Sequence, residues 1–281
     1  MELHNSGAEI YVPDGSPADA ALSRTTHLGV SAHQDDLEIM AYHGILECFG
    51  KPDKGFTGVT VTNGAGSPRD GLYGQYTDDE MQVVRRKEQK KAAYVGEYSA
   101  HVFLDYSSGA VKDPNNTYVV GDLKRIIAAA KPQVIYTHNL ADKHDTHVAT
   151  ALRLIRALRE LPEDSRPQHL YGCEVWRNLD WLNDDDKVIF NVQAHENLAM
   201  SLVGVFDSQV AGGKRYDLAT MGRRRANATY LASHGVDEST ALIFGTDLTP
   251  LMDAKLDVEQ YVQGYIKHFA EEVSRRIAKL L

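Results

Sequence analysis

Short apolar runs alternate with amphipathic helical patterns along the first 160 residues. The runs at 26–33, 56–62, 101–105 and 133–137 predict four strands, of which those at 56–62 and 133–137 are rich in β-branched residues. Apolar positions three or four apart predict helices over 38–49, 78–96, 122–130 and 148–161. Because strands that alternate with helices are typical of right-handed crossovers, the pattern predicts a parallel sheet.

The pattern changes after Pro162. Apolar runs at 169–175 and 188–192 predict two strands that can pair as an antiparallel hairpin at the sheet edge. From Leu256 to Leu280 apolar residues recur every three or four positions, which predicts one long amphipathic helix. We expect this helix to pack on the α/β body, with a subunit contact as the alternative. The predicted fold class is α/β: a Rossmann-like three-layer α/β/α sandwich with a mostly parallel sheet, a C-terminal hairpin and helices.

Composition favours one domain and narrows the choice of partners. The 281 residues are 43% hydrophobic without a break in composition, so we expect an N-terminal extension over 1–25 and a single domain over 26–281. A net charge of -9 argues against nucleic-acid binding, which depends on Lys and Arg. Cys48 and Cys173 form no disulfide framework. No stretch is apolar enough to span a membrane or to act as a signal peptide, so we expect a cytoplasmic protein.

An acidic segment, Ser31–Glu38, spans the end of the first predicted strand and the start of the helix after it. His33 and Asp36 offer a divalent metal one nitrogen and one hard oxygen, and Asp35 between them remains free for acid-base chemistry. The alternative is structural, because Asp35 and Glu38 have the spacing of a helix capping box. Taken alone, this segment favours the capping interpretation.

A histidine cluster follows the fourth predicted strand and reverses that preference. It contains His138, His144 and His147, with Asp142 and Asp145 interleaved. His144 and His147 are three residues apart at a predicted helix start, so both imidazoles can face one crevice. The carboxyl ends of strands in open α/β sheets are where ligands bind, and both polar segments follow such ends.

These two segments resemble the motifs of the PIG-L/LmbE-like family of metal-dependent de-N-acetylases. The family motif Ala-His-Pro-Asp-Asp-x-Glu is matched by Ala32–Glu38, and His-Pro-Asp-His by His144–His147. Arg85–Glu88 is similar to the Arg-x-x-Glu motif that the family carries on a helix between these two motifs. The resemblance covers roughly residues 26 to 210. The chain departs from the family at three places. Gln34 stands where the family has proline, Thr146 stands where it has aspartate, and Tyr42-His43 stand where it usually has Gly-Gly.

The resemblance implies a catalytic metal held by His33, Asp36 and His147. Zinc is the first expectation, and Fe²⁺ or another divalent metal is the alternative because the same ligand set suits non-haem iron. Bound water would have a pKa of about 7 and would lose its proton to Asp35 as general base. His144, preferably protonated, would stabilise the oxyanion. His138, Asp142 and Asp145 are candidates for orienting the ligands.

Substrate contacts are less specific in the sequence. Ser108 takes the place of a family acid that contacts sugar hydroxyls, and Arg69 and Asp70 lie on a glycine-rich loop at a strand end. Ser208-Gln209 resembles a family Ser-Gln element, but a plain polar helix end is the preferred interpretation.

The predicted function is zinc-dependent removal of an N-acyl group, foremost N-acetyl, from an amino sugar or its glycoside. The expected partner is therefore a small N-acetylated sugar, and a homo-oligomer is compatible with the sequence. The alternatives are an amidase of a thiol conjugate and a metal-containing sugar-binding protein without turnover.

Overall fold

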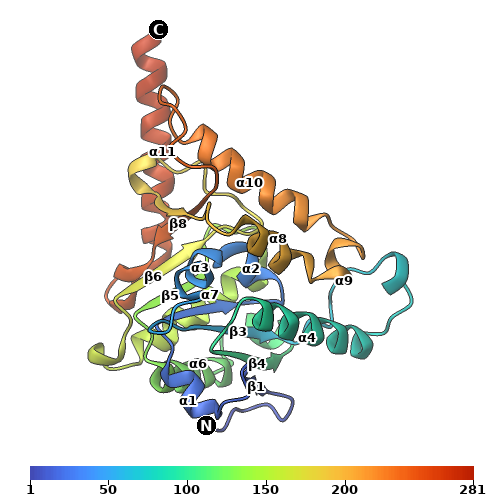
Figure 1. Ribbon diagram of the computed structural model, residues 1–281. Helices are drawn as coiled ribbons and strands as arrows, with labels where there is room; N and C mark the ends of the chain where they lie inside the picture. The colour runs from blue at the N-terminus through green and yellow to red at the C-terminus, as the bar shows by residue number, and fades with distance from the viewer.

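The computed structural model describes residues 1–281 and contains eight strands. They are β1 (Glu9–Tyr11), β2 (His27–Ser31), β3 (Phe56–Thr62), β4 (Ala100–Tyr106), β5 (Val134–His138), β6 (His169–Cys173), β7 (Val188–Asn191) and β8 (Leu242–Asp247). All eight belong to one sheet, in the order β1-β4-β3-β2-β5-β6-β8-β7 (Figure 1). The predicted α/β fold with a mostly parallel sheet is confirmed.

The five central strands are parallel and determine where a site can form. From β2 the chain adds β3 and then β4 on one side, whereas β5 and then β6 extend the sheet on the other side of β2. The strand order therefore reverses between β2 and β5. A crevice opens at the carboxyl ends of two strands that flank such a reversal, because their connections leave in opposite directions.

Eleven α-helices cover the sheet and extend beyond it. They are α1 (Ala18–Ser23), α2 (Asp36–Met40), α3 (Tyr42–Cys48), α4 (Asp78–Val95), α5 (Ser108–Lys112), α6 (Tyr118–Ala130), α7 (Asp145–Arg159), α8 (Glu196–Gly204), α9 (Asp207–Val210), α10 (Tyr216–Tyr230) and α11 (Val258–Leu280). One core layer joins the sheet to α1, α5, α6 and α7. A second core on the opposite face includes α2, α3, α4 and α8, which completes the three-layer sandwich (Figure 1).

The edges of the sheet differ from the sequence prediction. β1, in the segment interpreted as an extension, pairs antiparallel with β4 and was not predicted. The predicted hairpin is wrong, because β8 lies between β6 and β7 and pairs antiparallel with each. Hydrophobic periodicity identifies a strand but not its partner, and β8 reaches this position only after α8, α9 and α10. The single helix predicted over 38–49 is two helices, separated at Ala41, whose φ of -107° and ψ of 17° are not helical.

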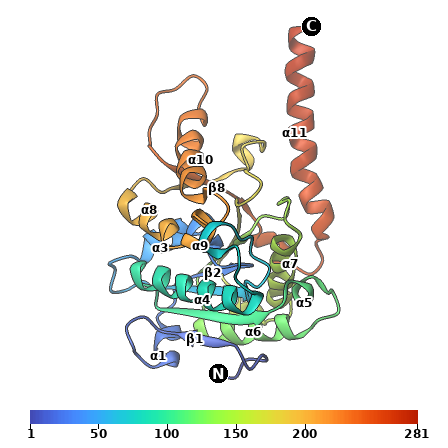
Figure 2. The same cartoon turned by 90° about the vertical axis from the view of Figure 1, so that its right-hand side faces the viewer.

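The C-terminal helix α11 packs on the body only at its first turns. Val258 and Tyr261 contact the larger core, and no residue of α11 is buried. Two perpendicular views show the rest of the helix projecting away from the sandwich (Figures 1 and 2). The expectation that α11 lies along the α/β body is therefore wrong for the C-terminal half of the helix, beyond Phe269. None of the helices combines the length and apolar character needed to cross a bilayer.

Candidate active site

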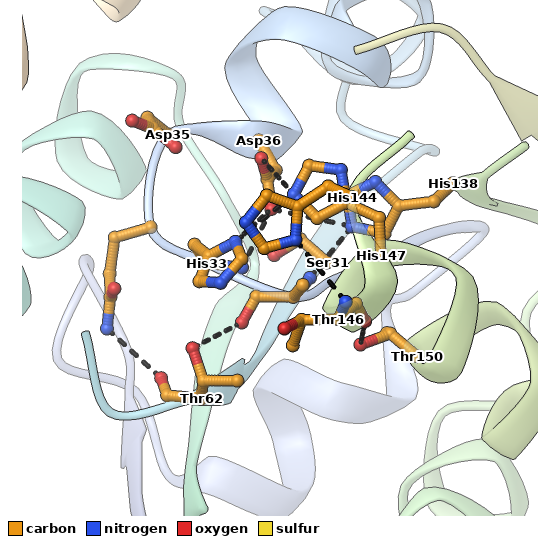
Figure 3. A network of polar contacts seen from close by, with 12 residues as sticks. Ser31, His33, Asp35, Asp36, Thr62, His138, His144, Thr146, His147 and Thr150 are labelled. Carbon is orange, nitrogen blue, oxygen red and sulfur yellow. Dashed lines mark hydrogen bonds and ion pairs between the residues drawn. The ribbon is translucent and has the colours of Figure 1, made fainter. Parts of the chain in front are cut away.

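The two polar segments meet at the strand-order reversal. His33 and Asp36 follow β2, and His147 lies in the first turn of α7, which begins after β5. The Nδ1 atom of His33 lies 3.2 Å from Nε2 of His147. These two nitrogens lie 3.4 Å from Asp36 Oδ2 and Asp36 Oδ1, respectively (Figure 3). Three potential ligand atoms from two segments more than a hundred residues apart thus converge on one point.

The charge states of these groups suit a cation. Burial raises the pKa of Asp36, but His147 and His138 outweigh it and hold the pKa well below its usual range, so the carboxylate is ionised. The backbone N–H of His33 also donates to Asp36 Oδ2 at 2.7 Å. Burial lowers the pKa of His147 to about 4 in spite of Asp36, so its imidazole is neutral. An ionised carboxylate and a neutral imidazole are the forms that ligate divalent metals.

A second layer of contacts orients the cluster. Oδ2 of Asp142 lies 3.6 Å from Nδ1 of His147, on the ring edge opposite Nε2. The Asp142 carboxylate is fixed by the backbone N–H groups of His144 (3.0 Å) and Trp176 (3.1 Å). A carboxylate behind a ligating histidine holds the ring with its free nitrogen towards the metal. Asp145, the other acid considered for this role, is exposed at the start of α7.

His138 supports the cluster from the end of β5. Its ring stacks on that of His147, with 3.9 Å between centroids, and its Nε2 accepts the backbone N–H of Ala32 at 2.9 Å. The same Nε2 lies 3.4 Å from Oδ2 of Asp36. His138 therefore ties β5 to the segment after β2 and fixes Asp36 relative to His147.

The donor set fits a divalent metal. Two overlapping groups bring ligand atoms together, one with His33, His144 and His147 and the other with Asp36, His138 and His147. His33, Asp36 and His147 join the two groups and supply two nitrogens and one oxygen. Three protein ligands leave coordination positions open, which distinguishes catalytic from structural zinc sites.

Asp35 is not an ordinary helix cap. It precedes α2 with a left-handed φ of 93°, and its side chain makes no capping hydrogen bond. Glu38, the other half of the supposed capping box, is buried and accepts hydrogen bonds from Tyr98 (2.6 Å) and Gln89 (2.8 Å). The structure therefore contradicts the capping-box interpretation. Asp35 instead lines a cavity beside the cluster.

The surroundings of Asp35 suit a proton acceptor. Burial raises its pKa to about 7, and this increase exceeds the opposing effect of the Arg85 guanidinium. An Arg85 nitrogen lies 3.4 Å from Oδ2 of Asp35, and Arg85 also donates to the carbonyl of Gln34. A carboxylate with a pKa near neutrality can both accept and return a proton at working pH.

The α4 helix links Asp35 to α9. Glu88, one turn after Arg85, accepts hydrogen bonds from the backbone N–H (2.7 Å) and hydroxyl (2.6 Å) of Ser208. Arg85 and Glu88 thus support the site separately rather than as a pair. Ser208 is completely buried and Gln209 lines the cavity. The interpretation of this segment as a plain polar helix end is wrong.

His144 occupies the N-cap position of α7. Its Nδ1 accepts the backbone N–H of Thr146 at 3.3 Å, which places the proton on Nε2. Burial and the neighbouring His33 lower the pKa of His144, so the ring is neutral near pH 7. The expected protonated form is therefore disfavoured, but the neutral tautomer still donates from Nε2.

The cavity next to the cluster has a volume of about 300 Å³. It is bounded by the following residues outside the cluster: Gly64, Gly66, Ser67, Pro68, Arg85, Ser108, Lys112, Thr146, Trp176, Gln209 and Tyr216. Trp176 and Tyr216 pack edge to face at 6.0 Å and form an aromatic wall. Larger hollows elsewhere on the surface contain no residue of the cluster.

The sequence analysis found part of this lining. Ser108 lies at the cavity as expected, whereas Trp176, Tyr216 and Lys112 were missed. Trp176 follows the carboxyl end of β6, so the rule that selected His33 could have selected it as well. Tyr216 has no comparable signal, because α10 returns to the site from a distant part of the chain.

Arg69 and Asp70 do not line the cavity. Arg69 donates to the Ala65 carbonyl at 2.7 Å and pairs with Asp78, so it holds its own loop together. Asp70 accepts the Gly71 N–H at 2.8 Å. Both side chains are occupied by local contacts, and neither reaches the cavity.

We expect the pH profile of kcat/KM to have an acidic limb at or below pH 7. The group responsible is Asp35, which must be deprotonated to accept a proton and whose pKa is raised to about 7 by burial. A nearby cation would move this limb to lower pH. The residual activity of Asp35→Asn should lack the limb, and an unchanged limb in that variant would assign it to another group.

A ligand set for a divalent metal, a carboxylate of raised pKa and a neutral imidazole donor around one cavity are the parts of a hydrolytic metal site. Residues 28–158 match the model of the GlcNAc-PI de-N-acetylase (PIG-L) family. The matched segment includes both motifs and all three residues expected to hold a metal. No curated protein sequence matches the chain.

Solved structures with the same fold include enzymes of different activity. The N,N'-diacetylchitobiose deacetylase from Pyrococcus horikoshii is 18% identical, with 78% of this chain and 82% of that chain covered and a TM-score of 0.58. The A40926 pseudoaglycone deacetylase is 18% identical (80% and 97% covered, TM-score 0.57). The 4-carboxy-2-hydroxymuconate hydratase from Pseudomonas putida is 15% identical (80% and 96%, TM-score 0.61). At these identities the similarity shows the fold alone.

Proposed function

We propose that the protein is a zinc-dependent hydrolase that removes an N-acyl group, foremost N-acetyl, from an amino sugar or its glycoside. The observation that carries the proposal is the position of Asp35, whose pKa is raised to about 7, beside a two-histidine, one-carboxylate cluster within a segment that matches the de-N-acetylase family. Asp35 lies at the cavity while Asp36 faces the histidines, so the two adjacent acids have separate roles (Figure 3).

His33, Asp36 and His147 would hold the metal. A bound zinc ion supplies Lewis acidity, which polarises an amide carbonyl and lowers the pKa of water. Asp35 takes the proton of the attacking water on its carboxylate and returns it to the leaving amine, with Arg85 keeping the carboxylate in place. The Nε2–H of His144 donates to the carbonyl oxygen as negative charge develops there.

The cavity supports a sugar-sized substrate. Its volume of about 300 Å³ is at the lower end of small-molecule sites. The side chains of Trp176 and Tyr216 offer an apolar surface for a sugar ring, while Ser108 and Lys112 on α5 can donate to hydroxyl or anionic groups. The two deacetylases of the same fold favour amide hydrolysis, whereas the hydratase shows that this fold also hosts other reactions.

The test is a screen of N-acetylated amino sugars and their glycosides for released acetate. Zinc-loaded protein should release acetate from at least one of them and lose the activity on metal removal, and Fe²⁺ loading would show whether iron replaces zinc. Cleavage restricted to amides of thiol conjugates would favour the alternative amidase. Sugar binding by metal-loaded protein without acetate release would favour a binding protein and contradict the proposal.

A further inference from the structure

From Ile266 onward, α11 carries a continuous apolar stripe. Ile266, Phe269, Val273, Ile277 and Leu280 are each between 36% and 80% exposed. At 100° per residue these five positions fall within a sector roughly 80° wide along the helix. The opposite face carries charged and small residues such as Glu271, Arg275 and Ala278. A helix with this pattern normally buries the stripe against another element.

The base of α11 is fixed to the body, which sets the direction of the stripe. The Tyr261 hydroxyl donates to the Asp247 carbonyl at 2.7 Å, and His268 Nδ1 lies 3.3 Å from an Asp186 carboxylate oxygen. Phe269 packs edge to face on Trp181 at 6.2 Å. Residues 270–281 extend beyond these contacts (Figure 2). Because isolated helices shorter than about 12–15 residues are marginal in water, this segment is stabilised if its stripe is covered.

We propose that the stripe binds the same stripe of a second copy of the chain, as an antiparallel helix pair centred on Val273. The two Val273 side chains then meet at the two-fold axis. Phe269 packs against the partner's Ile277, and Ile266 against the partner's Leu280. Each residue of the stripe has an apolar counterpart, as the isologous interface of a two-fold dimer requires.

The charges beside the stripe favour this orientation. Glu272 and Arg276 lie on one flank and form an ion pair within the helix. In an antiparallel pair each flank faces the same flank of the partner at nearly the same height. Each Glu272 therefore faces the partner's Arg276, and these two attractive contacts outnumber the one repulsive contact between the two Glu272 side chains that flank the axis.

A parallel pair lacks this match. It would place Glu272 and Arg276 opposite the other flank of the stripe, which carries the uncharged Ala270 and Ser274. It would also bring both α/β bodies to the same end of the helix pair, whereas the antiparallel arrangement places them at opposite ends. The antiparallel pair is therefore the arrangement that satisfies both the stripe and its charges.

Sedimentation of the full-length protein tests the proposal. Over a range of about 1 to 100 μM, the wild type should shift from monomer to dimer. Ile277→Glu places a charge in the stripe and should weaken dimerisation at least about tenfold, while Ala278→Glu places the same charge on the opposite face and should match the wild type. Both positions are exposed, so at the dilute end of this range, where all three proteins are monomers, circular dichroism and melting temperature should be unchanged. A wild type that is monomeric throughout, or an Ile277→Glu variant that associates like the wild type, would overturn the proposal.

Cross-linking distinguishes the two orientations. Chains with Ile266→Cys are mixed with chains carrying Leu280→Cys and then oxidised. The antiparallel pair predicts disulfides mainly between the two kinds of chain, and the buried Cys48 and Cys173 should not interfere. Disulfides formed mainly between like chains would show a parallel pair and contradict the assigned geometry.

Discussion

Asp35→Asn is expected to reduce kcat by at least about 10²-fold while metal content and melting temperature stay at wild-type values, because a general base typically contributes that much. The substitution is conservative at this position for a structural reason. Residue 35 has a left-handed φ of 93°, a conformation that asparagine adopts as readily as aspartate. Asparagine can also accept the Arg85 hydrogen bond, but it cannot take a proton from water.

The matched control is the neighbouring acid. Asp36→Asn removes a charged ligand instead of a base, so it should lower metal occupancy and activity together. Loss of activity alone at Asp35 and of both properties at Asp36 would separate their roles. Full activity in Asp35→Asn would contradict the mechanism, whatever Asp36→Asn does.

The second large effect is expected at His144. His144→Asn should lower kcat by about 10²- to 10³-fold, the usual result of removing one donor to a developing oxyanion. Asparagine is among the best N-cap residues, so it keeps the cap that the His144 side chain gives to α7 through the N–H of Thr146. Stability should therefore be retained while the Nε2–H donor is lost.

His144→Ala serves as the comparison, because it removes both functions. It should lose a similar factor in kcat and, in addition, about 1 kcal/mol of the free energy of unfolding, which is the typical value of an N-cap. Denaturant titration of both variants, together with kinetics, separates the two losses. A kcat of His144→Asn within a few-fold of wild type would show that His144 is only a cap.

The central part of the fold was predictable because its signals are local. The valine and threonine run at 56–62 gave β3 its observed bounds, and Gly96 marked the end of α4. The cap of α4 is Thr77, which forms a capping box with Glu80 just before the predicted start of the helix at residue 78. The edges of the sheet were not predictable in this way, because the position of β8 between β6 and β7 depends on packing between segments distant in the chain.

The residues of the candidate site also divide into those that local sequence predicts and those that depend on contacts between distant segments. His33, Asp36, His144 and His147 each lie close to the end of a strand in the sequence, so topology alone predicts that they converge. The buried contact of Ser208 with Glu88 could not be inferred, since a serine at a helix start looks the same whether it is exposed or buried. Arg69 shows the reverse case, in which a loop arginine is occupied by neighbours within its own loop.

The most direct test of the account is the metal content of the purified chain after loading with zinc and removal of unbound metal. Because ligand atoms from two strand ends converge on a single point, elemental analysis should find about one metal ion per chain. His33→Ala, Asp36→Ala and His147→Ala should each bind substantially less, and Asp35→Asn should bind as much as the wild type. Wild-type protein without bound metal, or equal metal content in all three ligand variants, would contradict the account.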